Sequence, residues 1–295
     1  MMPGSSTIPG VIDEWIRKTG AALDLRATID YGVQYRLSRG PEKAIVNVYS
    51  GKKGTRVVVQ LDSPLANEIR KLSGTERAEK QVATLDFKAW CGSDEAGKGE
   101  YLGPLTVAAV ALDRKSAATL AKLGVRDSKE LTNAAVAFLD KRIRAEAEFK
   151  LVGWLPEEYN RRYAEAGNSN LLLGIAHTEA LLGVIAKKPK LEAAVVDQFG
   201  DENYVKHGLL SKGCDIHLIQ RPKADATDLA VGAASIVARA AFMRGLQKLA
   251  RDYGVKLPVG NHDESIAAAR VFIRKHGRER LGMIAKLHFK TTGML

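Results

Sequence analysis

Residues 92–104 read GSDEAGKGEYLGP. This stretch begins at the end of one apolar run, 88–93, and precedes another, 106–112, and each run predicts a β-strand. Adjacent carboxylates, Asp94 and Glu95, therefore stand at the end of a strand, directly before a Gly-Lys-Gly sequence. Carboxylates in this position can bind a cation, and glycines let the backbone approach a bulky anion closely. A solvated acidic hairpin turn is the alternative interpretation, so further residues are needed to decide.

From residue 87 onward, apolar runs of strand length alternate with long helical patterns. This order predicts an α/β fold, a mixed sheet flanked by helices. The strands are expected at 88–93, 106–112, 149–155, 191–197 and 214–220. The helices are expected at 133–146, 170–187, 201–210, 225–253 and 263–275.

The first 80 residues have a different pattern. A short amphipathic helix over 11–20 precedes three strand-like runs, and a helix over 65–72 follows them. The strand-like runs are 34–37, 44–49 and 56–61. We therefore expect a small α+β domain over 1–80, a polar linker over 73–81 and a larger domain over 87–295. The expected hairpin tips are basic, with Arg39, Lys43, Lys52, Lys53 and Arg56.

The composition excludes several classes of protein. The 295 residues are 45% hydrophobic and 27% charged, which is typical of a globular chain and not of a disordered or collagen-like one. The longest uncharged apolar stretch that we consider for a membrane span, 101–112, is short and contains Pro104. The N-terminus lacks the basic and apolar regions of a secretory signal, and Cys91 and Cys214 lack the spacing of a zinc site. We expect a cytoplasmic monomer that does not bind membranes.

The net charge indicates a polyanionic partner. Lys and Arg number 45 against 34 Asp and Glu, which gives a formal charge of +11. Residues 86–204 carry a slight acidic excess, whereas the segments on both sides, and 205–295 above all, are basic. This distribution fits carboxylates gathered for a metal between basic regions that hold a phosphate backbone.

Two further carboxylates support a metal site. Asp197 ends the apolar run 191–196, at the carboxyl end of a strand, where ligand sites of α/β sheets concentrate. Asp225 lies directly before a long helix, where capping is the alternative role for it and for Asp228. Asp94, Glu95, Asp197 and Asp225 can converge at one edge of the sheet and bind a pair of divalent cations.

Several ordered motifs resemble the type 2 ribonucleases H. They are GSDEAGKGEYLGP at 92–104, the Asp127-Ser128-Lys129 sequence, the strand that ends at Asp197, and Lys-Ala-Asp225 followed by LAVGAASIVAR at 229–239. Within this family the chain is similar to the ribonuclease HIII branch. Residues 168–173 with His177, 256–260 and 285–290 carry that similarity.

The resemblance implies a ribonuclease H-like fold behind an N-terminal domain similar to the TATA-binding protein. It implies an endoribonuclease that uses Mg²⁺ or Mn²⁺ to cleave the RNA strand of RNA/DNA hybrids, leaving 5′-phosphate and 3′-hydroxyl ends. By the family motifs, Asp94, Glu95, Asp197 and Asp225 are catalytic and bind the metal. The expected substrate-binding residues are Gly97, Lys98, Gly99, Ser128 and Lys129.

Two other functions stay open from the sequence. Lys98 stands where ribonuclease HII has Arg and the HIII branch more often has Thr, so nicking at single ribonucleotides in duplex DNA is one alternative. A non-catalytic nucleic-acid-binding module is the other. Ser128 and Lys129 are equally compatible with a solvated helix start. His177 lies in an apolar helical stretch and is expected to be a hydrogen-bonded core residue rather than a metal ligand.

Overall fold

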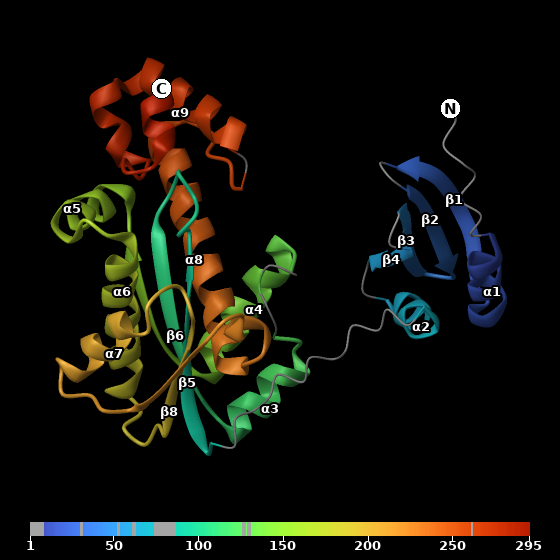
Figure 1. Ribbon diagram of the computed structural model, residues 1–295, viewed down its shortest axis with the longest axis horizontal. Coiled ribbons are helices and arrows are strands. Elements are labelled where there is room, and N and C mark those ends of the chain that lie inside the picture. Colours follow the sequence, from blue (N-terminus) through green and yellow to red (C-terminus); the bar gives the residue numbers. More distant parts are fainter. Residues whose placement is uncertain are drawn as a thin grey trace. The chain divides into compact units, whose positions relative to one another are not determined.

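A computed structural model of the chain describes residues 9–29, 32–51, 54–60, 63–73, 87–125, 128, 131–260 and 262–295. The chain folds into two compact units, Met1–Lys80 and Gln81–Leu295 (Figure 1). Lys52, Lys53 and the predicted linker beyond residue 73 lie outside the described residues, as does Lys129.

The N-terminal unit is an antiparallel meander with two helices. Helix α1 (Pro9–Thr19) precedes the strands, and α2 (Pro64–Leu72) follows them. The strands β1 (Ala22–Ile29), β2 (Gly32–Arg39), β3 (Glu42–Gly51) and β4 (Gly54–Gln60) pair in chain order. The predicted α+β arrangement is confirmed. Strand β1 was not predicted, although apolar residues at 23, 25, 27 and 29 alternate with polar ones, which is the period of a strand. Its residues are largely exposed in the structure.

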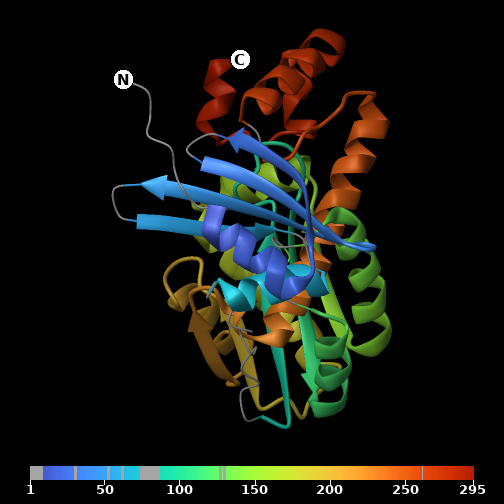
Figure 2. The ribbon, with the colours of Figure 1, turned by 90° about the vertical axis from the view of Figure 1, so that its right-hand side faces the viewer.

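The two helices of this unit cover one face of its sheet (Figure 2). Alternate strand residues such as Leu37 and Val46 pack with Trp15 and Leu65 in a buried core. The opposite face carries polar side chains, and a chain of hydrogen bonds links Arg36, Gln34, Asn47 and Tyr49. The apolar residues Ile45 and Val58 lie on the same face.

Arg39 lies at the β2–β3 hairpin, as predicted, but carboxylates engage its charge. Its guanidinium donates hydrogen bonds to Glu42 and Glu68 at 2.8 Å and to the carbonyl of Thr19 at 2.7 Å. These contacts fasten β2 to α2 and to the end of α1. Arg39 therefore acts inside the unit, whereas Arg56 is exposed.

The second unit is built on a five-stranded mixed sheet in the order β7-β6-β5-β8-β9. Its strands are β5 (Ala89–Ala96), β6 (Leu105–Asp113), β7 (Glu148–Trp154), β8 (Ala193–Asp197) and β9 (His217–Arg221). Strands β5, β6 and β7 are antiparallel neighbours, and β8 and β9 run parallel to β5. The predicted mixed sheet is confirmed, with all five strands within a few residues of their expected bounds.

Helices cover both faces of this sheet (Figure 1). Trp90 faces a core with α4 (Asn133–Glu146) and α8 (Leu229–Tyr253), and the next residue, Cys91, faces a core with α6 (Ser169–Ile185) and α7 (Asn203–Leu210). Further helices of the described residues are α3 (Arg114–Lys122), α5 (Pro156–Ala166), α9 (His262–His276) and the short 3₁₀ helices η2 (Ala224–Ala226), η3 (Arg278–Met283) and η4 (Lys290–Met294).

Helices α3 and α5 were not predicted from the sequence. Each follows a strand almost directly: Asp113 ends β6 and also forms a capping box with Ser116, and Pro156 opens α5. Both helices are short and have few large apolar residues, although these residues do recur at the helical period, so the sequence carried a signal for them.

Helix α8 is long and apolar enough to cross a membrane by length and composition, although Arg239 and Arg244 interrupt its apolar stretch. In the structure, 78% of its most apolar window is buried inside the protein. Helix α8 is therefore a core helix that packs on β5 and β6.

Candidate active site

The four predicted acids lie along one edge of the second unit's sheet. Asp94 and Glu95 are near the end of β5, and the parallel pairing of Ser93 with Val196 brings Asp197, the last residue of β8, beside them. Asp225 lies in η2, where the neighbouring N–H of Ala224 donates to Asp197 Oδ1 at 2.8 Å. Strand register and one hydrogen bond therefore bring three separate segments to the same edge.

Asp225 does not cap the long helix. The N-cap of α8 is Asp228, whose side chain accepts from the N–H groups of Ala230 and Val231. Burial raises the pKa of Asp228 above its ordinary value, and the hydrogen bonds from Val231 and Trp90 oppose that rise. The capping role that the sequence left open for both aspartates belongs to Asp228 alone.

The predicted convergence of the acids is only partly observed. Within the described part of the chain, no three His, Cys, Asp or Glu side chains are grouped so that they could hold a metal ion. Like charges repel, and the carboxylates are held by separate donors, as the backbone N–H of Glu95 holds Asp94 at 2.7 Å and that of Ala224 holds Asp197.

The charges nevertheless interact. Burial raises the pKa of Asp94 well above its ordinary value, and the nearby charges of Glu95 and then Asp197 raise it further. A hydrogen bond with Ser235 opposes this rise. Buried, mutually repelling carboxylate oxygens are suited to hard divalent cations, so the donor chemistry of this edge fits Mg²⁺ or Mn²⁺.

His177 contacts one of the acids. Its ring is fully buried, its Nε2 lies 3.1 Å from Glu95 Oε2, and its Nδ1 lies 2.8 Å from Ser93 Oγ. The prediction of a hydrogen-bonded core histidine agrees with these contacts. The link to Glu95 was missed, because 82 residues separate the two and only the packing of α6 on β5 joins them.

The glycines of the Gly-Lys-Gly loop have different surroundings. Gly97 has φ +87°, and a Cβ there would lie 2.3 Å from the carbonyl oxygen of Pro104, so the fold itself requires glycine. A Cβ at Gly99 would meet nothing within 4 Å, so the backbone there is open to a ligand. Between them, Lys98 Nζ lies 3.7 Å from Glu95 Oε1 and donates to the carbonyl of Phe199 at 3.4 Å.

Ser128 differs from the predicted phosphate contact. Its side chain is buried, and its Oγ lies 2.8 Å from Ser235 Oγ. Arg239 also donates to its carbonyl oxygen. Because Ser235 in turn bonds Asp94, the Ser128 hydroxyl belongs to a buried hydrogen-bond chain that ends at the acid.

The C-terminal segment fastens the loop that follows the two glycines. Lys286 is fully buried, and its ammonium donates to the carbonyls of Glu100 at 2.8 Å and Gly103 at 2.9 Å. A β-bridge between Leu102 and Ala285 joins the same segments. Residues at the end of the chain therefore help to fix the backbone beside the acids.

This buried lysine predicts a pH-dependent stability. Burial lowers the pKa of Lys286 from its ordinary 10.5 to about 7. Between these values the unfolded chain binds the proton more tightly than the folded one, so the free energy of unfolding rises with pH, by at most about 1.4 kcal/mol per pH unit. Urea unfolding at pH 7, 8 and 9 should show this rise in the free energy of unfolding for the wild type. The rise should be absent for Lys286→Met. Equal pH slopes in the two proteins would contradict it.

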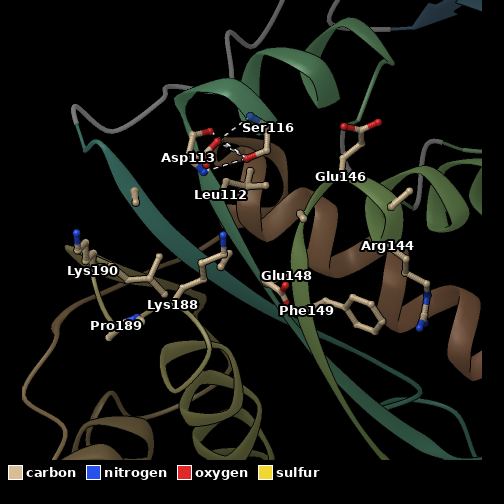
Figure 3. A pocket seen from close by; sticks show the side chains of 15 residues that line it. Leu112, Asp113, Ser116, Arg144, Glu146, Glu148, Phe149, Lys188, Pro189 and Lys190 are labelled. Carbon is tan, nitrogen blue, oxygen red and sulfur yellow. Dashed lines mark hydrogen bonds between the residues drawn. The ribbon is translucent and has the colours of Figure 1, made fainter.

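A separate pocket lies at the opposite edge of the sheet. It has a volume of about 420 Å³ and is lined by the start of β5 at Ala89, the end of β6 at Asp113 and the start of β7 at Glu148. Figure 3 shows charged side chains of both signs around it, including Arg144 and Lys188. None of the predicted site residues lines this pocket.

Comparisons with known proteins identify the family. The profile of the ribonuclease HII family matches residues 91–292, a span that includes all four acids. The chain belongs to this family. The match confirms the resemblance to the type 2 ribonucleases H that the sequence motifs carry.

Relatives of this ribonuclease HII family chain bear the name ribonuclease HIII. The chain is 38% identical to one from Protochlamydia amoebophila over 207 residues, which cover 70% of this chain and 68% of that protein. It is 35% identical to one from Chlamydia abortus over 260 residues, 86% and 84% of the two chains.

Solved structures agree with this assignment. Bst-RNase HIII, crystallised in complex with Mn²⁺, matches with a TM-score of 0.66 and 26% identity over 99% of this chain and 96% of its own. RNase HII of Archaeoglobus fulgidus, solved in a complex with PCNA, matches 70% of this chain and 99% of its own, with a TM-score of 0.54 and 28% identity. The first of these spans both units of this chain, as expected for the HIII branch.

Proposed function

We propose that this protein is an endoribonuclease that hydrolyses the RNA strand of RNA/DNA hybrids with two divalent metal ions, leaving 5′-phosphate and 3′-hydroxyl ends. The observation that supports it most is the row of carboxylates at one sheet edge, brought there by three separate segments in a chain of the ribonuclease HII family. The proposal uses the same four acids that the sequence singled out.

In this proposal Asp94, Glu95, Asp197 and Asp225 hold the metal ions. Their carboxylate oxygens are the hard donors that Mg²⁺ and Mn²⁺ prefer. When bound, such ions supply an activated water and neutralise charge on the leaving oxygen. The protein orients the acids through its strand ends and through the donors at Glu95 N, Ala224 N and His177.

The Gly-Lys-Gly loop is proposed to hold the nucleic-acid backbone beside the acids. The open space at Gly99 allows a phosphate or ribose to approach the main chain, and Gly97 keeps the loop against Pro104. Lys98 contributes a positive charge at the same place. Lys129 is proposed as a further phosphate contact, by its motif alone.

The face of the N-terminal sheet that lies opposite to its helices is proposed to bind the hybrid as well. It presents amide, phenol and guanidinium groups, which suit phosphate and ribose oxygens. Replacing Arg36 and Arg56 together by Ala should weaken hybrid binding and lower the slope of log Kd against log salt by about 1 for each phosphate that the variant no longer neutralises.

The control removes two basic groups from the helix side of the same unit. Arg17 and Lys18 are exposed on α1. If their replacement by Ala lowered the salt slope as much as the Arg36 and Arg56 replacement, net charge alone would account for the effect. Titrations of a fluorescent hybrid across a salt series would measure both.

The HII-like alternative is tested by a pair of substrates. One is a long RNA/DNA hybrid, and the other is a DNA duplex with one embedded ribonucleotide. Lysine lacks the planar fork of the arginine that stands at this loop position in ribonuclease HII, so we expect faster cleavage of the hybrid. A strong preference for the single ribonucleotide would replace our proposal by the HII-like one.

We further propose that the protein works as a monomer in the cytoplasm. Both cysteines, Cys91 and Cys214, are free thiols, which suits a reducing compartment. Analytical ultracentrifugation with and without hybrid would test the monomer.

A further inference from the structure

We propose that His177 is a positioning residue, which holds the carboxylate of Glu95 in the orientation that binds metal. The inference rests on the proposed function, because it concerns one of the acids assigned there. His177 itself lies on α6, on the face of the sheet opposite to α8.

The ring forms a bridge between two residues of one strand. Its Nε2 lies 3.1 Å from Glu95 Oε2, and its Nδ1 lies 2.8 Å from Ser93 Oγ. An ionised carboxylate oxygen only accepts hydrogen bonds, so Nε2 carries the hydrogen in the first contact. Ser93 completes the bridge at the other nitrogen and fixes the rotation of the ring.

The surroundings leave the ring little freedom to move. His177 is 0% exposed, and it stacks on Phe199 with ring centroids 4.8 Å apart and planes 16° apart. Phe199 lies two residues beyond Asp197, on the loop that leaves β8. The ring therefore contacts the ends of both strands that carry acids.

The two carboxylate oxygens of Glu95 have different partners. Oε2 of Glu95 accepts from His177, while Oε1 lies 3.7 Å from the ammonium of Lys98. The side chain of Glu95 is 12% exposed, so hydrogen bonds with water contribute little to fixing its orientation. Partners of this kind, which orient a metal ligand without touching the metal, change metal affinity by about 10–100-fold when removed.

The test measures metal binding directly, in the full chain without substrate. Electron paramagnetic resonance of free Mn²⁺ gives the Kd for the wild type, His177→Leu and His177→Gln. Leucine removes the donor, and we expect the Kd to rise about 10–100-fold. Glutamine offers an N–H at a similar reach, and we expect it to restore most of the affinity. Excess Mn²⁺ should also restore the kcat of His177→Leu.

Thr178→Val is the matched control. Thr178 is the next residue of α6, and within the described part of the chain its buried hydroxyl has no hydrogen-bond partner. Its replacement should leave the Mn²⁺ Kd unchanged. A rise equal to that of His177→Leu would show that any change inside α6 disturbs the acids, and would overturn the proposal.

Other outcomes separate this inference from the proposed function. If folded His177→Leu binds Mn²⁺ like the wild type, or His177→Gln binds no better than His177→Leu, His177 does not position Glu95, although the protein can still be a nuclease. If His177→Leu does not fold, Ser93→Ala decides, and an unchanged Kd there overturns the inference. A wild type that neither binds Mn²⁺ nor cleaves hybrid would contradict the proposed function itself.

Discussion

Replacing Asp94 by Asn is expected to lower the cleavage of RNA/DNA hybrids by about 10³-fold or more, which corresponds to about 4 kcal/mol of transition-state stabilisation. Asp94 precedes Glu95 in β5 and lies beside Asp197 of β8 at the proposed metal edge. Asparagine keeps the size of the side chain and removes its charge, so the variant loses metal affinity without a cavity. Cleavage of a labelled hybrid at saturating Mg²⁺ or Mn²⁺ measures the effect.

The same substitution should not weaken the fold. Burial and two neighbouring carboxylates raise the pKa of Asp94, so the folded state holds this proton more tightly than the unfolded chain. Stability is therefore lost as the pH rises from the ordinary pKa of Asp towards the raised one. At neutral pH without metal, Asp94→Asn should unfold at the same or a higher urea concentration than the wild type. A less stable variant would show that its lost activity reflects unfolding.

Replacing Gly92 by Ala is expected to destabilise the second unit by about 3 kcal/mol and to lower activity by about 100-fold. A Cβ at this position would lie 2.3 Å from the backbone nitrogen of Val231 and 2.5 Å from the carbonyl carbon of Ala230. Backbone atoms cannot rotate away as a side chain can, so α8 and β5 must separate. Because Gly92 lies two residues before Asp94, this movement also displaces the acids.

Gly153 provides the matched control for that substitution. It lies on β7 in the same sheet, is exposed, and a Cβ there would meet only Thr106 Cγ2 at 3.7 Å. Gly153→Ala should leave both stability and activity close to the wild type. Denaturant unfolding would measure the difference, and similar losses in the two variants would contradict the packing argument.

The sequence predicts the second unit well where burial is continuous. The run 107–112 is apolar throughout and is buried between helices, so its short length and its β-branched residues, not a period, indicate a strand. Strand β1 was missed although apolar and polar residues alternate from Leu23 to Ile29, so the sequence did carry the period of a strand there. Leu23 and Leu25 are exposed in the structure, so this alternation does not mark a buried face. Helices α3 and α5 were missed because they begin at the ends of strands.

The candidate site, too, could be predicted only in part from the sequence. The positions of Asp94 and Asp197 follow from strand ends, which a sequence pattern reveals. Tertiary packing between distant segments determines three other features of the site. They are the buried side chain of Ser128, the contact of His177 with Glu95, and the burial of Lys286. No local spacing indicates such contacts, although a histidine in an apolar helix was a signal that a buried polar partner existed.

We propose that the carboxylates at this edge make the chain a metal-dependent nuclease for RNA/DNA hybrids. The most direct test incubates the full chain with a hybrid labelled on the 5′ end of either strand, with Mg²⁺ or Mn²⁺ and then with excess EDTA. We predict internal cleavage of the RNA strand only, new 5′-phosphate ends, and no cleavage after chelation. An intact RNA strand with both metals, or equal cleavage of the DNA strand, would contradict the claim.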